Sequence, residues 1–190
     1  MKGIQSEKVI PTIKHFPGHG DTFVDSHHEL PIVNKSLPEL EKLELIPFDC
    51  AIEEGAEMVM IAHILLPKVD QQLPSSLSKE IITGILRNKI GFDGVIITDD
   101  MTMKAITENF NIGSAAVMSV KAGSDMIMVA HDYYDNIMKV FSALKKAVEQ
   151  GEISEERLNE SVTRILKLKK KVDINELNQQ IEGVLDQYMN

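Results

Sequence analysis

Four short apolar runs recur along the chain, and they constrain its fold more than any other feature. Each run is rich in Val, Ile or Met and is nearly continuous rather than alternating, which is typical of strands buried on both faces of a parallel sheet. Segments with helical spacing of apolar residues lie between the runs. The sequence therefore predicts an α/β fold with strands at residues 9–16, 58–63, 94–99 and 125–130.

Capping and stop signals mark the helices expected between the strands. Ser36 and Glu39 form a capping box, and Pro47 interrupts the helix that they begin. Ser78 can cap a second helix, which Gly91 stops. Further helices are expected at residues 113–121, 134–150 and 154–172. The last of these is predicted to bury the apolar stripe of Leu158, Val162, Ile165 and Leu166.

Alternating strands and helices make either a doubly wound sheet or a (β/α)8 barrel. The first 151 residues would give four units of about 38 residues each, whereas a barrel of roughly 250 residues spends about 31 on each of eight. Four units are half of a barrel. We expect a half-barrel domain over residues 1–172 and a helical tail over residues 173–190.

Charge and cysteine content exclude several classes of partner. The chain has 20 basic and 29 acidic side chains, a formal net charge of −9, which argues against nucleic acid and anionic membranes as partners. A single cysteine, Cys50, excludes an intramolecular disulfide. No apolar run approaches the roughly 20 residues of a membrane helix, and no signal peptide is recognisable. As the chain stands we expect a cytoplasmic protein, or an extracellular or lipid-anchored one if an N-terminal signal precedes it.

Ionisable side chains cluster where three of the predicted strands end. Lys14 and His15 end the first strand, His63 the second, and Asp99 and Asp100 the third. Barrels and open α/β sheets both place their sites at this edge. The Lys14 ammonium group at the end of a buried strand indicates function, because an unpaired charge there is costly. By contrast, either Asp99 or Asp100 can simply cap the next turn, and His63 can hydrogen-bond a neighbouring loop.

The Asp25-Ser26-His27 triplet suggests a general acid/base. In an extended segment residues two apart face the same side, so Asp25 can hydrogen-bond His27 and set its tautomer and charge. Asp99 would then be the partnering nucleophile. A carboxylate nucleophile with a separate proton donor is the logic of retaining glycoside hydrolysis.

A metal site is the competing interpretation, and a metal-dependent hydrolase remains an alternative. Pro17, Gly18 and Gly20 prevent the helix that would pair two histidines four residues apart, and no zinc motif is present, so we predict no metal and no cofactor. The potential ligands that crowd fourteen positions are His15, His19, Asp21, Asp25, His27 and His28.

Five motifs follow one another along the chain. They are Lys-His-Phe-Pro-Gly-His-Gly-Asp-Thr from Lys14, Asp-Ser-His from Asp25, Met-Ile-Ala-His ending at His63, Gly-Val-Ile-Ile-Thr-Asp-Asp-Met-Thr-Met from Gly94, and Ala-Gly-Ser-Asp-Met from Ala122. In this order they resemble the β-N-acetylglucosaminidases of glycoside hydrolase family 3. The resemblance implies a (β/α)8 barrel that removes non-reducing terminal N-acetylglucosamine from peptidoglycan-type fragments with retention and without a metal.

The resemblance also implies a role for each matched residue. Asp99 corresponds to the nucleophile that forms the glycosyl-enzyme, and His27, with Asp25 as its partner, to the general acid/base. The residues that would contact the sugar are Lys14, His15 and His63.

The family's first four strands carry an Asp-x-Glu-Gly-Gly segment and an arginine that help to grip the sugar, and nothing in this sequence corresponds to them. The chain therefore resembles the second half of the catalytic barrel. We expect a substrate of N-acetylglucosamine-containing saccharide or muropeptide. Because the first half of the barrel is absent, we expect the isolated chain to be inactive. The alternative is a non-catalytic or self-associating half-barrel fragment, since half of a barrel exposes two sheet edges that can pair with a second copy or with a missing first half.

Overall fold

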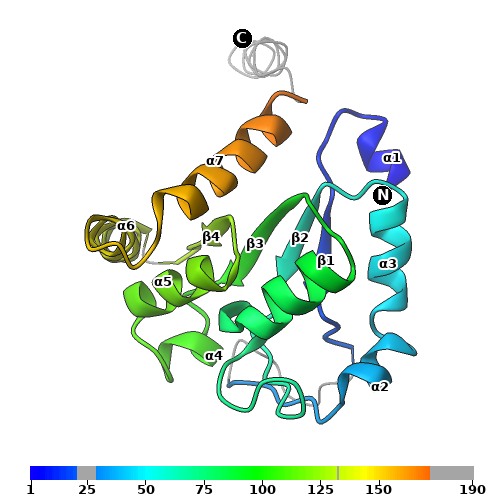
Figure 1. Ribbon diagram of the computed structural model, residues 1–190, viewed down its shortest axis with the longest axis horizontal. Helices are drawn as coiled ribbons and strands as arrows, with labels where there is room; N and C mark the ends of the chain where they lie inside the picture. Colours follow the sequence, from blue (N-terminus) through cyan, green and yellow to red (C-terminus); the bar gives the residue numbers. More distant parts are fainter. Residues whose placement is uncertain (21–28, 132, 172–190) are drawn as a thin grey trace, which may run out of the picture.

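Four parallel strands form one sheet in the order in which they occur along the chain, as the computed structural model shows (Figure 1). The structure describes residues 1–20, 29–131 and 133–171. The predicted α/β fold with parallel strands is confirmed, and the first, second and fourth strands are shorter than expected. The strands are β1 (Thr12–Phe16), β2 (Met58–Ile61), β3 (Val95–Asp100) and β4 (Met126–Met128).

Helices connect successive strands, and in Figure 1 the sheet lies between α3 on one flank and α6 on the other. Each crossover from one parallel strand to the next contains helix, as parallel pairing requires. The helices are α1 (Lys2–Gln5), α2 (Leu37–Glu41), α3 (Ile46–Glu53), the short 3₁₀ turn η1 (Ser75–Leu77), the π-helical η2 (Glu80–Lys89), α4 (Lys104–Thr107), α5 (Ile112–Ala122), α6 (Tyr133–Glu149) and α7 (Glu155–Lys169).

The predicted capping box is present at the start of α2. The Glu39 carboxylate accepts the backbone N–H of Ser36 at 2.7 Å, and Ser36 is the N-cap. Pro47 was expected to interrupt this helix, but it lies in the first turn of a separate one, α3, where its missing N–H costs no hydrogen bond. Gly91 follows η2 with φ +80°, the backbone conformation that glycine adopts readily at a helix end.

The two inner strands are more deeply buried than the two outer ones. In β3, Val95, Ile96 and Thr98 are almost inaccessible to solvent, whereas only Phe16 is buried in β1 and no residue of β4 is. The prediction that all four strands are buried on both faces is therefore wrong for β1 and β4. Within the described part of the chain, no strand pairs with the outer edge of either one.

Two apolar clusters hold the helices onto the sheet. The larger one joins β1, β2 and β3 to α3 and η2, and the smaller one joins α4, α5 and α6. Together they fix the carboxyl ends of the strands relative to one another. Representative members are Phe16, Phe48, Ile61, Ile85 and Ile96 in the first cluster, and Met101, Ile106, Ala115, Ala116 and Val140 in the second.

A buried ion cluster fastens the opposite, amino-terminal end of β4. The Asp125 side chain is inaccessible to solvent and binds Arg87, Arg157 and Arg164 at 2.5, 3.2 and 3.4 Å. It also accepts the Ser161 hydroxyl at 2.9 Å. Burial lowers the pKa of Arg87 to about 10, although Asp125 opposes that shift. The cluster connects η2, β4 and α7 through one carboxylate.

The apolar stripe of the last helix is not buried as predicted. Leu158, Val162 and Leu166 remain 39%, 43% and 53% exposed, and Ile165 is half-buried. Helix α7 is held by Arg157 and Arg164, which bind Asp125. The predicted tail, residues 173–190, lies outside the described residues. No helix of the described residues has both the length and the apolar content to cross a membrane.

Candidate active site

The carboxyl ends of three strands bring the predicted site residues to one edge of the sheet. Parallel pairing places Phe16 of β1 opposite Ile61 of β2, and Ile61 opposite Thr98 of β3. The residues beside these positions are those that sequence analysis selected. His15, His63 and Asp99 therefore gather from positions up to 84 apart in sequence.

Asp99 presents a carboxylate whose two oxygens have different surroundings. Its Oδ1 accepts the backbone N–H of Asp100 at 2.8 Å, which fixes the plane of the group. Its Oδ2 lies 3.6 Å from Nε2 of His15, with the Asp99 side chain 14% exposed. One oxygen is thus held by the backbone, while the other faces an imidazole at the strand edge.

Asp100 has a structural environment that distinguishes it from its neighbour. Its carboxylate accepts the Thr102 N–H and hydroxyl at 3.0 and 2.6 Å and the Ala130 N–H at 2.9 Å, and it lies 3.0 Å from Nδ1 of His131. Burial alone would raise the pKa of Asp100, but these hydrogen bonds together hold it below its usual value. Asp100 therefore caps the turn after β3 and ties it to the end of β4.

His63 is fully buried behind the strand ends. Its Nε2 lies 3.0 Å from the Asp100 carbonyl oxygen and its Nδ1 lies 2.7 Å from the Ser76 hydroxyl. Because a carbonyl can only accept, Nε2 carries the proton and donates it, and Nδ1 accepts from Ser76. Burial lowers the pKa of His63, with the Asp99 carboxylate opposing the shift, so the ring is neutral near pH 7.

The two hydrogen bonds of His63 match the alternative in which this histidine bonds a neighbouring loop. It supports the Asp99–Asp100 segment from below through a backbone carbonyl. Sequence analysis missed its partner Ser76, which lies 13 residues further along in a serine-rich turn and carries no motif. The same analysis gave no role to His131, which bonds Asp100 from the next strand end.

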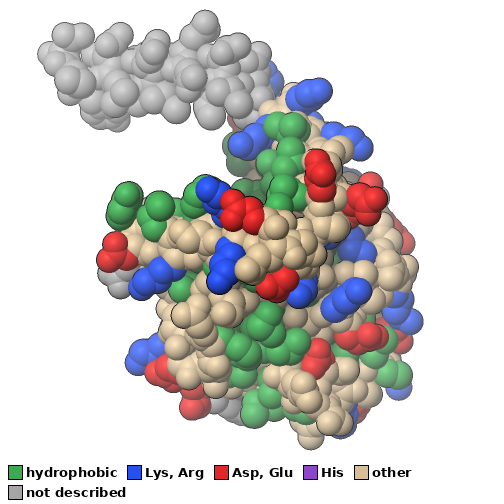
Figure 2. Space-filling model, turned by 60° about the vertical axis from the view of Figure 1, so that its left-hand side comes forward, with side chains coloured by type: hydrophobic (Ala, Val, Ile, Leu, Met, Phe, Trp, Pro, Cys, Tyr) green, Lys and Arg blue, Asp and Glu red, His purple; other side chains and the backbone are tan. Residues whose placement is uncertain are grey.

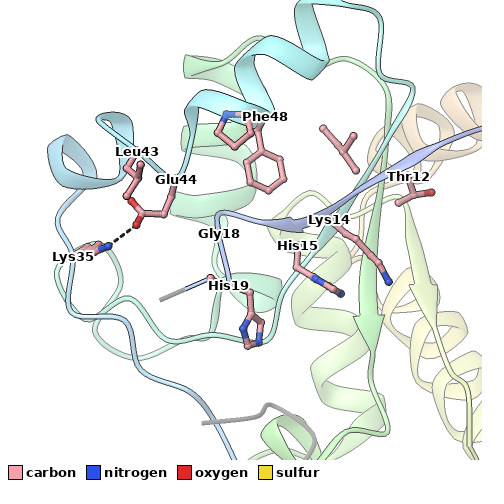
Figure 3. A pocket seen from close by; sticks show the side chains of 12 residues that line it. Thr12, Lys14, His15, Gly18, His19, Lys35, Leu43, Glu44 and Phe48 are labelled. Carbon is pink, nitrogen blue, oxygen red and sulfur yellow. Dashed lines mark hydrogen bonds and ion pairs between the residues drawn. The ribbon is translucent and has the colours of Figure 1, made fainter. Parts of the chain in front are cut away.

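A pocket of about 820 Å³ opens beside β1 (Figure 3). Lys14, His15 and His19 line it from the strand and the loop that follows. The ion pair of Lys35 with Glu44 lies on the opposite wall. His15 connects this pocket with Asp99, which is not among its lining residues.

Two predicted catalytic residues, Asp25 and His27, lie outside the described residues. The same gap contains four of the six residues that suggested a metal. Among residues 1–20, 29–131 and 133–171, no group of three His, Cys, Asp or Glu side chains is placed to hold a metal ion.

Comparison with protein families gives one match over most of the chain. Residues 1–168 match the glycosyl hydrolase family 3 N terminal domain. The chain is 32% identical over 189 residues to "Beta-hexosaminidase A" of Pseudoalteromonas piscicida, covering 90% of this chain and 32% of the relative. It is 39% identical over 143 residues to a "Beta-hexosaminidase" of Neisseria meningitidis serogroup C, covering 74% of this chain and 39% of the relative.

Solved structures share the fold as well. A glycoside hydrolase family 3 β-N-acetylglucosaminidase from Paenibacillus sp. str. FPU-7 superposes with a TM-score of 0.87 and 47% identity, over 90% of this chain and 32% of that one. CbsA from Thermotoga neapolitana, solved with Zn bound, superposes with a TM-score of 0.79 and 41% identity, over 84% of this chain and 35% of that one.

The chain spans about a third of the length of the relatives it matches. The matched third is the four parallel β/α units described above, so the fold is a partial barrel of the α/β class, as the resemblance implied. Both of these curated relatives are named beta-hexosaminidases. The chain belongs to glycosyl hydrolase family 3.

Proposed function

We propose that this chain carries the chemical centre of a retaining β-N-acetylglucosaminidase, with Asp99 as its nucleophile. The observation that carries the proposal is the arrangement of Asp99 at the carboxyl end of an inner strand. Its Oδ1 is fixed by a backbone N–H, while Oδ2 lies at the edge that faces His15. A fixed carboxylate with one oxygen toward the site is what attack on an anomeric carbon requires.

The reaction would proceed in two steps, and the product would keep the anomeric configuration of the substrate. In the first, Oδ2 of Asp99 bonds to the anomeric carbon as the glycosidic bond breaks, and the leaving oxygen takes a proton from His27. In the second, His27 accepts a proton from water, whose oxygen attacks the anomeric carbon and releases Asp99. Asp25 would hold the His27 ring in the required tautomer.

Lys14 and His15 are proposed to bind hydroxyl groups of the sugar. Both line the pocket beside β1, and the ammonium and imidazole groups can donate hydrogen bonds to hydroxyl oxygens. His63 supports the site from behind, because its ring is bonded on both sides by protein atoms. The names of the relatives support N-acetylglucosamine as the sugar, and a peptidoglycan-type fragment is the proposed source.

The test combines hydrolysis with trapping of the intermediate. The chain is assayed on a chromogenic N-acetylglucosaminide, alone and co-expressed with the remaining barrel units of the Paenibacillus sp. enzyme. A 5-fluoro-N-acetylglucosaminyl fluoride slows the second step, so the covalent sugar accumulates and peptide mass spectrometry locates it. The proposal expects the label on Asp99.

Matched variants separate chemistry from folding. Asp99→Asn should lower turnover by about 10³-fold or more, and His27→Ala by roughly 10²-fold. Asp93→Asn is the control, since Asp93 precedes the other end of β3 and its side chain is 85% exposed. A label on any other carboxylate, or an Asp99→Asn variant with the turnover of the Asp93→Asn control, would refute the role of Asp99.

A further inference from the structure

His63 is an ionisable side chain that is fully buried just after an inner strand, β2. Lys, Arg, Asp and Glu side chains, by contrast, are spread over the surface of the protein, as Figure 2 shows for one face. Two serines of the turn η1, Ser75 and Ser76, are buried as well. A buried polar side chain costs free energy unless it is hydrogen-bonded, and even a bonded pair is often no more stable than apolar side chains of the same shape. The pair of Ser76 and His63 therefore indicates a role beyond packing.

The hydrogen bonds of His63 form a chain that runs in one direction. The Ser76 hydroxyl donates to Nδ1 of His63 at 2.7 Å, and Nε2 of His63 donates to the Asp100 carbonyl oxygen at 3.0 Å. The backbone N–H of the same Asp100 donates to Oδ1 of Asp99 at 2.8 Å. The turn η1 is connected in this way, through one histidine and one backbone residue, to the proposed nucleophile.

The Asp100 carbonyl oxygen accepts two hydrogen bonds of different origin. One comes from the Met103 N–H at 3.0 Å, which belongs to the same turn and so does not fix the turn relative to the sheet. The other comes from His63, which follows the neighbouring strand β2. On the opposite side, the Met101 N–H bonds the Met128 carbonyl of β4 at 3.0 Å. His63 therefore holds the turn after β3 from the side of β2.

We infer that Ser76 and His63 are positioning residues for Asp99, which they hold in place through the backbone of Asp100. The inference rests on the proposed function, in which Asp99 is the nucleophile. Because the Ser76 hydroxyl donates to Nδ1, the ring proton stays on Nε2, where it can hold the Asp100 carbonyl. In the other tautomer the lone pair of Nε2 would face the carbonyl oxygen, and the Asp100 backbone would shift together with the N–H that fixes Asp99.

This arrangement acts on the chemical steps rather than on binding of the sugar. Lys14 and His15, which are proposed to bind sugar hydroxyl groups, line the pocket beside β1, whereas neither Ser76 nor His63 lines it. Asp99 bonds to the anomeric carbon in the first step and leaves it in the second, so a displaced carboxylate slows both steps. Loss of the hydrogen-bond chain should therefore lower kcat and leave KM close to that of wild type.

The chain complemented with the remaining barrel units tests the inference through a matched pair of serine variants. Ser76→Ala should lower kcat about tenfold, which is part of the roughly 10²-fold that displacing a reacting group by about 1 Å costs. Ser75→Ala is the control, because Ser75 is equally buried but its hydroxyl donates to the Ile64 carbonyl at 2.9 Å. A Ser76→Ala enzyme with the kcat of Ser75→Ala, or one whose KM rises while kcat stays unchanged, would overturn the inference.

Variants of His63 test the donor itself. His63→Leu removes the donor and should lower kcat by roughly 10²-fold. His63→Gln keeps an N–H donor and a carbonyl acceptor in a side chain that does not titrate, so it should regain most of kcat. A residue that only fills space would not distinguish these two substitutions in this way. Equal kcat values in the Gln and Leu variants would contradict the positioning role.

NMR of the chain alone separates this inference from the proposed function. The nitrogen resonances of the His63 ring should show the proton on Nε2 in wild type and in Ser75→Ala, but a mixture of tautomers in Ser76→Ala. The amide of Asp100, which bonds Asp99, should exchange with solvent several-fold faster in Ser76→Ala than in Ser75→Ala. Equal exchange rates, or a proton on Nδ1 in wild type, would show the inference to be wrong. A complemented wild type that hydrolyses no N-acetylglucosaminide would instead refute the proposed function, and the two serine variants would still decide by NMR whether Ser76 holds Asp99 in place.

Discussion

Asp125→Asn is expected to destabilise the fold strongly, although it replaces only one side-chain atom. It changes one oxygen to an amide within the cluster of Arg87, Arg157 and Arg164, whose side chains are only 11%, 18% and 21% exposed. Asp125 also accepts the backbone N–H of Ile96 at 3.0 Å. The variant removes the single negative charge on which three partly buried guanidinium groups converge, and directs an N–H₂ group toward a donor.

Breaking a buried ion pair by neutralising one partner costs about 3–5 kcal/mol, because the remaining charge stays desolvated. We expect a loss near the middle of this range, since the guanidinium groups keep some solvent contact and Arg164 also binds Asp93 at 3.2 Å. A domain is stable by about 5–15 kcal/mol, so the variant should lose a large share of its stability. With a urea m-value of about 2 kcal/mol/M, the midpoint should fall by about 2 M.

Urea unfolding followed by circular dichroism measures the change, with Asp93→Asn as the matched control. Asp93 binds the same Arg164, but its side chain is 85% exposed, so its loss should cost less than about 1 kcal/mol. Arg87→Met should cost less than Asp125→Asn, because the carboxylate keeps two cationic partners. If Asp125→Asn lost no more than Asp93→Asn, the burial argument for this cluster would be wrong.

Three further predictions test other parts of the structure. Burial lowers the pKa of His63 in the folded protein below the value near 6.5 that it has in the unfolded chain. The free energy of unfolding should therefore be undiminished above pH 6.5 and fall by up to about 1.4 kcal/mol per pH unit below it. Urea unfolding at pH 7 and pH 5 should show that wild type loses part of its extra stability over His63→Gln at the lower pH, and an unchanged difference would contradict this. Gly123→Ala should lower the stability by about 1–3 kcal/mol in a thermal melt, since φ is +125° and a Cβ would lie 2.8 Å from Oγ1 of Thr83. Gly55→Ala is the control for backbone strain alone, because Gly55 has φ +85° but open space around it, and it should cost less. Asn111→Ala should lose about 1 kcal/mol, because its side chain accepts two N–H groups at the start of α5, and an unchanged melting temperature would contradict that role.

Local chemistry made much of the fold predictable. The apolar runs located all four strands. The capping box at Ser36 begins a helix and Gly91 follows the end of another, as the sequence predicted. These features depend on neighbours within a few residues, so no tertiary information was needed. Pro47 was misinterpreted because proline disrupts a helix interior but suits a first turn, and the local sequence does not show which applies.

Burial was harder to predict because it depends on what lies beside an element. The α7 stripe has the spacing of a buried face, yet Leu158 and Leu166 are exposed because arginines, rather than leucines, attach the helix. Likewise β1 and β4 have the composition of inner strands but lie at the edges of the sheet. Periodicity indicates which residues can be buried, while the neighbours decide whether they are.

The sequence by itself determined the class of fold, the family and the position of the ionisable residues at the strand ends, because strand periodicity and motif spacing are properties of the chain alone. Only the tertiary structure decided what those residues contact. Of the two adjacent aspartates, Asp100 has its carboxylate hydrogen-bonded as the cap of a turn, whereas the carboxylate of Asp99 faces His15. The structure also placed His63 behind them, hydrogen-bonded to Ser76. Hydrogen bonds between strand ends set these roles, and they form only when distant segments pack side by side.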